Sequence, residues 1–199
     1  MNDRGRYQPL SYFQLMEVSL RELLVEKGLI TEEQVAATVE DWRRRTPERG
    51  AKVVARAWVD AEFKKRLLAN GTRACEEIGI DVPALKLVVV ENTPQVHNVI
   101  VCTLCSCYPR MLLGIPPDWY KSRNYRSRMV REPRVVLAEF GLKVPDDVQI
   151  RVHDSTADMR YMVLPMRPSG TEAWSEERLA TLVTRNAMIG VAVAKEPGT

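Results

Sequence analysis

The chain has 199 residues, of which 45% are hydrophobic, and this is enough for one good core with a separate arm. Its 29 basic and 26 acidic side chains leave a net charge of only +3, so charge alone excludes nucleic acid as an expected partner. No run approaches the roughly 18 apolar residues of a membrane helix. Met1–Tyr7 contains no apolar signal core, so we expect a cytoplasmic protein without a membrane contact.

The first 49 residues are predicted to form a helical arm and a linker. A helix that ends at Gly28 carries an apolar stripe with three- and four-residue steps: Leu10, Phe13, Met16, Leu20, Leu23 and Leu24. A second helix is expected from Thr31, capped with the help of Gln34, to about Arg45. Thr46–Gly50 is the predicted linker. The apolar stripe needs a cover, which is either the chain's own domain or another subunit.

Residues 50–199 are predicted to form the second domain. Its expected fold class is α+β: after the helical arm, a layered α/β/β/α domain that carries a metal claw loop. The expected elements are helices at Lys52–Trp58, Asp60–Ala69 (closed by Asn70-Gly71) and Pro133–Phe140, a turn capped by Asp118, strands at Leu85–Glu91, His97–Val101, Gln149–Asp154 and Arg160–Leu164, and a final helix opened by Ser175.

Three cysteines, Cys102, Cys105 and Cys107, lie within six residues and must serve one centre. Structural zinc requires four side-chain ligands, and the only histidines, His97 and His153, do not stand at a zinc-ligand spacing from them. The clustering favours a metal in a reducing compartment over a disulfide framework. The fourth cysteine, Cys75, lies on an apolar helical face and is expected to be inert core.

A single residue separates Cys105 from Cys107, so the peptide nitrogens of Ser106 and Cys107 are expected near any ion that the two sulfurs hold. Thiolates and deprotonated amides are strong-field donors, which suit a small trivalent transition metal better than zinc or calcium. Three sulfurs and two nitrogens would leave one octahedral position open.

The run Cys102-Thr103-Leu104-Cys105-Ser106-Cys107 resembles the metal claw of the nitrile hydratase α subunit, a family that includes the γ subunit of thiocyanate hydrolase. The resemblance covers the chain from about Thr46 onward. It extends through these stretches: Gly50–Trp58, Phe63–Gly71, Val90–Val101, Leu113–Tyr120, Tyr125–Arg134, Arg160–Gly170 and Trp174–Val191.

The resemblance implies a ligand set of the sulfurs of Cys102, Cys105 and Cys107 and the main-chain nitrogens of Ser106 and Cys107. It also implies oxidation of Cys105 to a sulfinate and of Cys107 to a sulfenate, the two catalytic residues. Thr103 resembles the cobalt type, so cobalt(III) is expected rather than iron(III). The implied reaction is hydration of a nitrile to an amide, with the Cys107 sulfenate as nucleophile or as base.

The family also implies partners. The chain would be active only with a β-type subunit, or with two separate small subunits, whose arginines bind the oxidised sulfurs, and a cobalt chaperone would load it. Within this chain Arg160 is a candidate neighbour of the centre, with an ordinary salt-bridged arginine as the alternative. The arginine-rich run Tyr125–Arg134 is interpreted as a charged inter-subunit face.

Two departures from the family pattern bear on the substrate. Arg110 stands where many nitrile hydratases have an apolar wall, which favours a charged or polar substrate; its alternative role is a carboxylate pair at a subunit contact. Pro83-Ala84 occupies the place of a glutamine near the active site. The alternatives to a nitrile hydratase are therefore a thiocyanate hydrolase γ subunit, the α subunit of a three-subunit nitrile hydratase for a cyano-nucleoside such as toyocamycin, or a metal-storage protein without turnover.

Overall fold

The computed structural model describes residues 10–82, 86–105 and 107–198. The chain divides into two compact units, residues 1–44 and residues 45–199. The first unit contains α1 (Tyr12–Glu26) and α2 (Glu32–Arg44). The second unit contains, in chain order, α3 (Pro47–Val59), α4 (Ala61–Ala69), α5 (Gly71–Glu77), β1 (Lys86–Glu91), β2 (Val96–Val101), α6 (Arg110–Leu113), α7 (Asp118–Lys121), α8 (Arg123–Met129), α9 (Pro133–Glu139), β3 (Gln149–Asp154), β4 (Met159–Leu164), α10 (Glu176–Ala180) and α11 (Arg185–Ile189).

Both predicted helices of the first unit are confirmed, and each begins with reciprocal capping. The Gln14 N–H donates to the Ser11 hydroxyl while the Ser11 N–H donates to the Gln14 side chain, and Thr31 and Gln34 repeat this arrangement. Every residue of α1 and α2 is described, and none of them is buried. The apolar stripe of α1 therefore finds no cover within its own unit, and Phe13 is 78% exposed.

The predicted linker Thr46–Gly50 is wrong, because α3 already begins at Pro47. Proline is favoured in the first helical turn, where its fixed φ suits the helix and its missing N–H costs nothing. Gly50 lies buried inside this helix rather than in a linker. A Cβ there would lie 2.7 Å from the Met188 sulfur and 2.9 Å from the Leu113 side chain, so the glycine permits close packing.

The four predicted strands are confirmed within one residue of their expected bounds, but they form two separate two-stranded sheets. β1 pairs with β4 and β2 pairs with β3, both parallel. β1 and β2 are consecutive and joined by a short turn, yet they do not pair with each other. In the second sheet Val101 lies opposite Asp154, so both strands end at the same edge.

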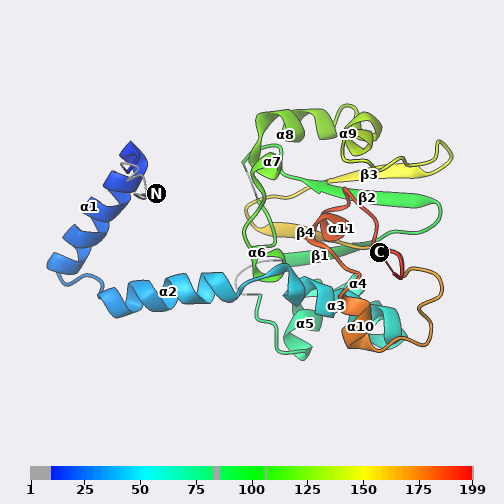
Figure 1. The fold of residues 1–199 in the computed structure, drawn as a ribbon, viewed down its shortest axis with the longest axis horizontal. Coiled ribbons are helices and arrows are strands. Elements are labelled where there is room, and N and C mark those ends of the chain that lie inside the picture. The colour runs from blue at the N-terminus through cyan, green and yellow to red at the C-terminus, as the bar shows by residue number, and fades with distance from the viewer. Residues whose placement is uncertain (1–9, 83–85, 106, 199) are drawn as a thin grey trace, which may run out of the picture. The chain divides into compact units, whose positions relative to one another are not determined.

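The second unit has the expected layered arrangement. In Figure 1, α7, α8 and α9 lie on the side of the β2–β3 sheet, and α3, α4, α5 and α10 lie on the side of the β1–β4 sheet. The element contacts agree, since α9 packs on β3 whereas α4 and α5 pack on β1. The two sheets lie next to each other through β2 and β4.

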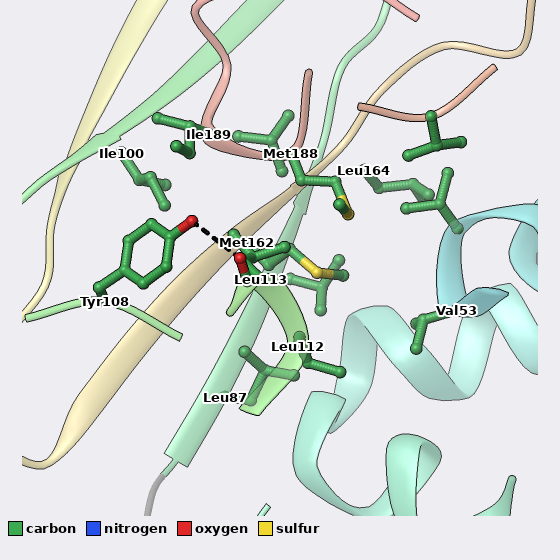
Figure 2. Packing of buried hydrophobic residues seen from close by; sticks show 14 of the residues in the cluster. Val53, Leu87, Ile100, Tyr108, Leu112, Leu113, Met162, Leu164, Met188 and Ile189 are labelled. Atoms are coloured by element: carbon green, nitrogen blue, oxygen red, sulfur yellow. Dashed lines mark hydrogen bonds between the residues drawn. The ribbon is translucent and has the colours of Figure 1, made fainter. Parts of the chain in front are cut away.

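The core lies between these layers and reaches the cysteine-rich loop. Figure 2 shows the Tyr108 ring beside Ile100, with its hydroxyl donating to the Leu113 carbonyl at 3.4 Å. Tyr108 directly follows Cys107 and is 3% exposed. The downstream end of the loop is thus anchored in the hydrophobic core.

Three local predictions need correction. Asn70-Gly71 does not only close α4, because the Asn70 side chain caps a further helix, α5, by accepting from the Arg73 N–H. Asp118 is the first residue of α7 and not its cap, and its carboxylate pairs with Lys121. The helix opened by Ser175 is not the final one, because α11 follows it.

Cys75 is a core residue, as expected. It is fully buried in α5, and burial raises the pKa of its thiol to about 12.

No helix in the described ranges is both long and apolar enough to cross a membrane.

Candidate metal centre

The cysteine-rich loop begins at the point where β2 ends. β2 is buried from His97 to Val101, and Cys102 follows at 0% exposure. Cys107 is also buried, at 8%, whereas Cys105 between them is exposed. A loop fixed at both ends by buried residues therefore presents its middle sulfur to the surface.

The three sulfurs gather at one point. The Sγ of Cys105 lies 3.5 Å from that of Cys102 and 3.1 Å from that of Cys107, and all three lie within 4.8 Å of one another. These distances exceed the roughly 2.05 Å of a disulfide bond, and all three cysteines are free. Ser106, predicted to supply a main-chain nitrogen, lies outside the described residues.

Two of the three sulfur–sulfur distances are compatible with sulfurs that share one metal ion. With a metal–sulfur bond of about 2.3 Å, two sulfurs at a right angle lie about 3.3 Å apart, and two at the tetrahedral angle about 3.8 Å apart. The observed 3.1 and 3.5 Å bracket the right-angle value. Zinc would also need a fourth side chain, and the group found among the described residues contains only these three cysteines.

The two histidines are engaged elsewhere. The Nε2 of His97 donates to the Gly190 carbonyl at 2.7 Å, and the Nε2 of His153 donates to the Asn98 side chain at 2.8 Å. Neither belongs to the sulfur cluster, in agreement with the argument against zinc from the sequence.

Asp154 holds the first part of the loop. Its carboxylate accepts the Thr103 main-chain N–H at 2.9 Å and the Thr103 hydroxyl at 2.5 Å. Sequence reasoning placed Asp154 at the end of a strand but missed this contact, because only the parallel pairing of β2 with β3 brings the two residues together.

Arg126, in α8, binds the main-chain carbonyls of the same part of the loop. Its Nη1 donates to the Cys105 carbonyl at 2.7 Å and to the Thr103 carbonyl at 3.4 Å. Sequence reasoning missed this role, since it assigned the whole arginine-rich run to an inter-subunit face. Within that run, Arg128 pairs with Glu139 and Arg134 donates to the Val144 carbonyl, so three of its arginines bond within their own chain.

The aromatic residues after the loop act in packing, as predicted. Tyr120 is fully buried, and its hydroxyl donates to the Cys107 carbonyl at 2.9 Å. Trp119 packs edge-on against Tyr125 and Phe140 at centroid distances of 4.9 and 4.7 Å. The carbonyl side of Cys107 is therefore fixed from the core.

The electrostatics around Cys107 combine burial with one cation. Burial, followed by the hydrogen bond with Cys105, raises the pKa of the Cys107 thiol to about 12, and the positive charge of Arg160 opposes this rise. The thiol is thus protonated in the metal-free chain, and a metal must displace its proton. The Arg160 guanidinium also donates to the Ala157 carbonyl at 2.8 Å.

The remaining candidates are Arg110 and the Pro83-Ala84 pair. Arg110 is the first residue of α6, on the exposed side of the segment after the loop. Pro83-Ala84, the second departure from the family pattern, is outside the described residues. The structure thus brings together the three cysteines, Thr103 and Arg160, and adds Asp154 and Arg126.

Comparisons with known proteins agree with this site. The family profile described as "Nitrile hydratase, alpha chain" matches residues 11–192. The chain is 54% identical over 180 residues to the cobalt-containing nitrile hydratase subunit alpha of Pseudonocardia thermophila, covering 89% of this chain and 88% of the relative. It is 45% identical over 203 residues to the thiocyanate hydrolase subunit gamma of Thiobacillus thioparus, covering 96% and 83%.

Solved structures give the same picture. A recombinant thiocyanate hydrolase with partially modified cobalt centres superposes with a TM-score of 0.89 at 44% identity, covering 95% of this chain and 93% of that one. A double mutant of the Fe-type nitrile hydratase from Comamonas testosteroni Ni1 also gives 0.89, at 47% identity, covering 96% and 94%. The chain therefore belongs to the nitrile hydratase α-chain family.

Proposed function

We propose that this chain is the metal-bearing α subunit of a cobalt nitrile hydratase, which adds water to a nitrile to form an amide. The observation that carries the proposal is the group of three free sulfurs within 4.8 Å of one another, in a chain 54% identical to a cobalt-containing α subunit. The nearby Thr103 supports cobalt over iron through its resemblance to cobalt-type members.

The donor set fits the proposed ion. The sulfurs of Cys102, Cys105 and Cys107 would hold it, together with the main-chain nitrogens of Ser106 and Cys107. When bound, a trivalent cobalt supplies a Lewis acid for a nitrile or a water at the open position.

The chain's own residues would orient and activate the reactants. We infer that Cys105 and Cys107 are oxidised, and that the Cys107 oxygen acts as nucleophile or as base toward a water molecule. Arg160 places a positive charge near Cys107, which would stabilise a charged oxygen there. Asp154 and Tyr120 would hold the loop in the geometry that the ion requires.

A β-type partner completes the proposed enzyme. The apolar face of α1 is not covered by its own unit, in which Phe13 is 78% exposed and Leu20 58% exposed. Such a face lowers its free energy by burial, and we propose that the helical arm, whose second helix ends at Arg44, wraps around the partner while residues 45–199 form the catalytic domain. The partner would consist of one β-type subunit or two small ones, and a cobalt chaperone would load the centre.

The test is reconstitution in cells supplied with cobalt. The full chain is co-expressed with its β-type partner, and the purified complex is assayed with an aliphatic nitrile. We expect amide production, one cobalt per α chain by elemental analysis, and an intact mass that includes the oxygens of a sulfinate and a sulfenate. Iron in place of cobalt would contradict the metal assignment, and a loaded complex that turns over no nitrile would contradict the activity.

A thiocyanate hydrolase γ subunit is the second candidate. It is favoured by the alignment with the Thiobacillus thioparus protein, which covers 96% of this chain, and by the exposed cation Arg110 directly after the loop. The same complex is therefore assayed with thiocyanate and with a cyano-heterocycle such as toyocamycin. If Arg110 selects a charged or polar substrate, Arg110→Leu lowers kcat/KM for that substrate more than for the aliphatic nitrile.

A further inference from the structure

Arg126 makes a contact with the cysteine-rich loop that no residue of the loop itself provides. It lies in α8, more than twenty residues along the chain, and its Nη1 reaches the Cys105 carbonyl at 2.7 Å and the Thr103 carbonyl at 3.4 Å. One guanidinium nitrogen thus spans two carbonyls, one before and one at the exposed cysteine. The shorter bond is charge-assisted and is the stronger of the two.

The surroundings of Arg126 indicate that the loop is its principal partner. Its Nε is buried without a hydrogen-bond partner in the described part of the chain. Arg128, two residues along the same helix, instead forms a two-pronged pair with Glu139. Among the described residues no carboxylate forms an ion pair with Arg126, so its positive charge stays directed at the loop. A buried unpartnered donor is costly, so the two carbonyl contacts must offset that cost.

The contact bears directly on the ligand geometry. A peptide unit is planar, so fixing the direction of a carbonyl also fixes the plane of the amide to which it belongs. The Cys105 carbonyl belongs to the amide that links Cys105 to the next residue of the claw. Holding that carbonyl also limits how far the exposed Cys105 sulfur can move from the buried sulfurs of Cys102 and Cys107.

We propose that Arg126 is a positioning residue of the metal claw: it fixes the Cys105 peptide for the bound metal and offsets part of the negative charge of the three sulfurs. The inference rests on the proposed function, since it requires a metal at the three cysteines. It adds to that function a cation from the α chain itself, in contrast to the arginines expected from the partner subunit.

The test compares three variants of the full chain, each co-expressed with the β-type partner in cobalt medium. Arg126→Met removes the charge and the donors at similar length, and Arg126→Lys keeps the charge on a shorter side chain without the planar guanidinium. Arg123→Met is the matched control, because Arg123 is an exposed arginine at the start of the same helix. Three quantities are measured: cobalt release to a chelator under reducing conditions, the visible sulfur-to-metal absorption band, and the melting temperature of the metal-free protein.

We expect Arg126→Met to release cobalt about 10- to 100-fold faster than the wild type and to shift the absorption band, as losses around a metal site typically do. The rate of cobalt release from Arg126→Lys should lie between those of the wild type and Arg126→Met, and Arg123→Met should release cobalt at the wild-type rate. If Arg126→Met fails to assemble, the comparison of Arg126→Lys with Arg123→Met decides the question.

Two results would overturn the proposal. One is unchanged cobalt release and an unchanged band in both Arg126 variants. The other is a lower melting temperature of the metal-free Arg126 variants without faster cobalt release. Arg126 would then only stabilise the packing of the loop on α8. A failure of the proposed function looks different, because then the wild-type complex itself holds no cobalt or hydrates no nitrile.

Discussion

Asp154 accepts two hydrogen bonds from Thr103, at 2.9 Å from the main-chain N–H and at 2.5 Å from the hydroxyl. Asp154 is the last residue of β3, and its register partner Val101 is the last residue of β2. The loop that leaves β2 is therefore fastened to the neighbouring strand within two residues. A loop held in this way is pre-organised for a metal, because less freedom is lost when the ion binds.

Asp154→Ala should weaken metal retention by about 10- to 100-fold, because it removes both acceptors of Thr103. Thr103→Val removes only the hydroxyl and should have a smaller effect. Both are measured as cobalt per chain after dialysis against a chelator. Asp147→Ala, at an exposed turn, is the control. Equal cobalt contents in Asp154→Ala and Asp147→Ala would show that the hydrogen bonds between Asp154 and Thr103 do not contribute to metal retention.

Cys105→Ala and Cys107→Ala should each abolish cobalt binding and turnover, because each removes one of three sulfurs that share one centre. Cys75→Ala should keep both cobalt and activity. Because Cys75 is fully buried, this variant should lose about 1 kcal/mol of unfolding free energy. Elemental analysis, nitrile assays and urea denaturation give these three quantities. Full turnover in either claw variant would refute the assigned site.

His97 should make the metal-free chain less stable in mild acid. Burial lowers the pKa of His97 below its usual value of 6.5, against the opposing hydrogen bond to the Gly190 carbonyl. The Nδ1 of His97 also lies 3.4 Å from the Asn92 amide nitrogen, so a second ring proton would face a donor. Burial lowers the pKa of His153 as well, followed by the charge of Arg151.

The sign follows from proton binding. Below the unfolded-state pKa of about 6.5, the unfolded chain binds a proton at each histidine that the folded chain does not bind. The free energy of unfolding is therefore at its full value above this pH and decreases as the pH falls toward the folded-state pKa. Urea denaturation of the metal-free chain should thus show a lower unfolding free energy at about pH 5.5 than at about pH 7.5. His97→Gln should show a smaller difference between the two pH values, and an equal or larger difference would contradict the assignment.

Gly190→Ala should destabilise the fold by at least about 3 kcal/mol. Gly190 has a φ of +92°, and a Cβ there would lie 2.1 Å from the Asn98 carbonyl oxygen. Gly141→Ala is the matched control, because Gly141 has a φ of +84° but no atom within 4 Å of its added Cβ, so only the backbone cost of about 1 kcal/mol applies. Urea denaturation measures both, and similar losses would show that the close approach to β2 does not matter.

Much of the fold could be predicted from local pattern. The strand Gln149–Asp154 and the helix beginning at Pro133 lie where alternation and proline placement indicate them. The linker at Thr46–Gly50 was mispredicted because Pro and Gly also occur inside helices, at the first turn and at close packing contacts. The pairing of β1 with β4 was not predicted, since partners so far apart in the chain are selected by burial and not by local residues.

The residue pattern alone was enough to predict one centre for the three cysteines of the loop. Cys102, Cys105 and Cys107 are close enough along the chain for one tight loop to bring their sulfurs together, and their number and spacing already argue against zinc. The residues that surround these cysteines could be identified only from the folded chain. Asp154 and Arg126 reach the loop because the parallel pairing of β2 with β3 and the packing of α8 bring distant segments to one sheet edge. Such contacts depend on which surfaces are buried together, and this is a property of the whole chain rather than of any short segment.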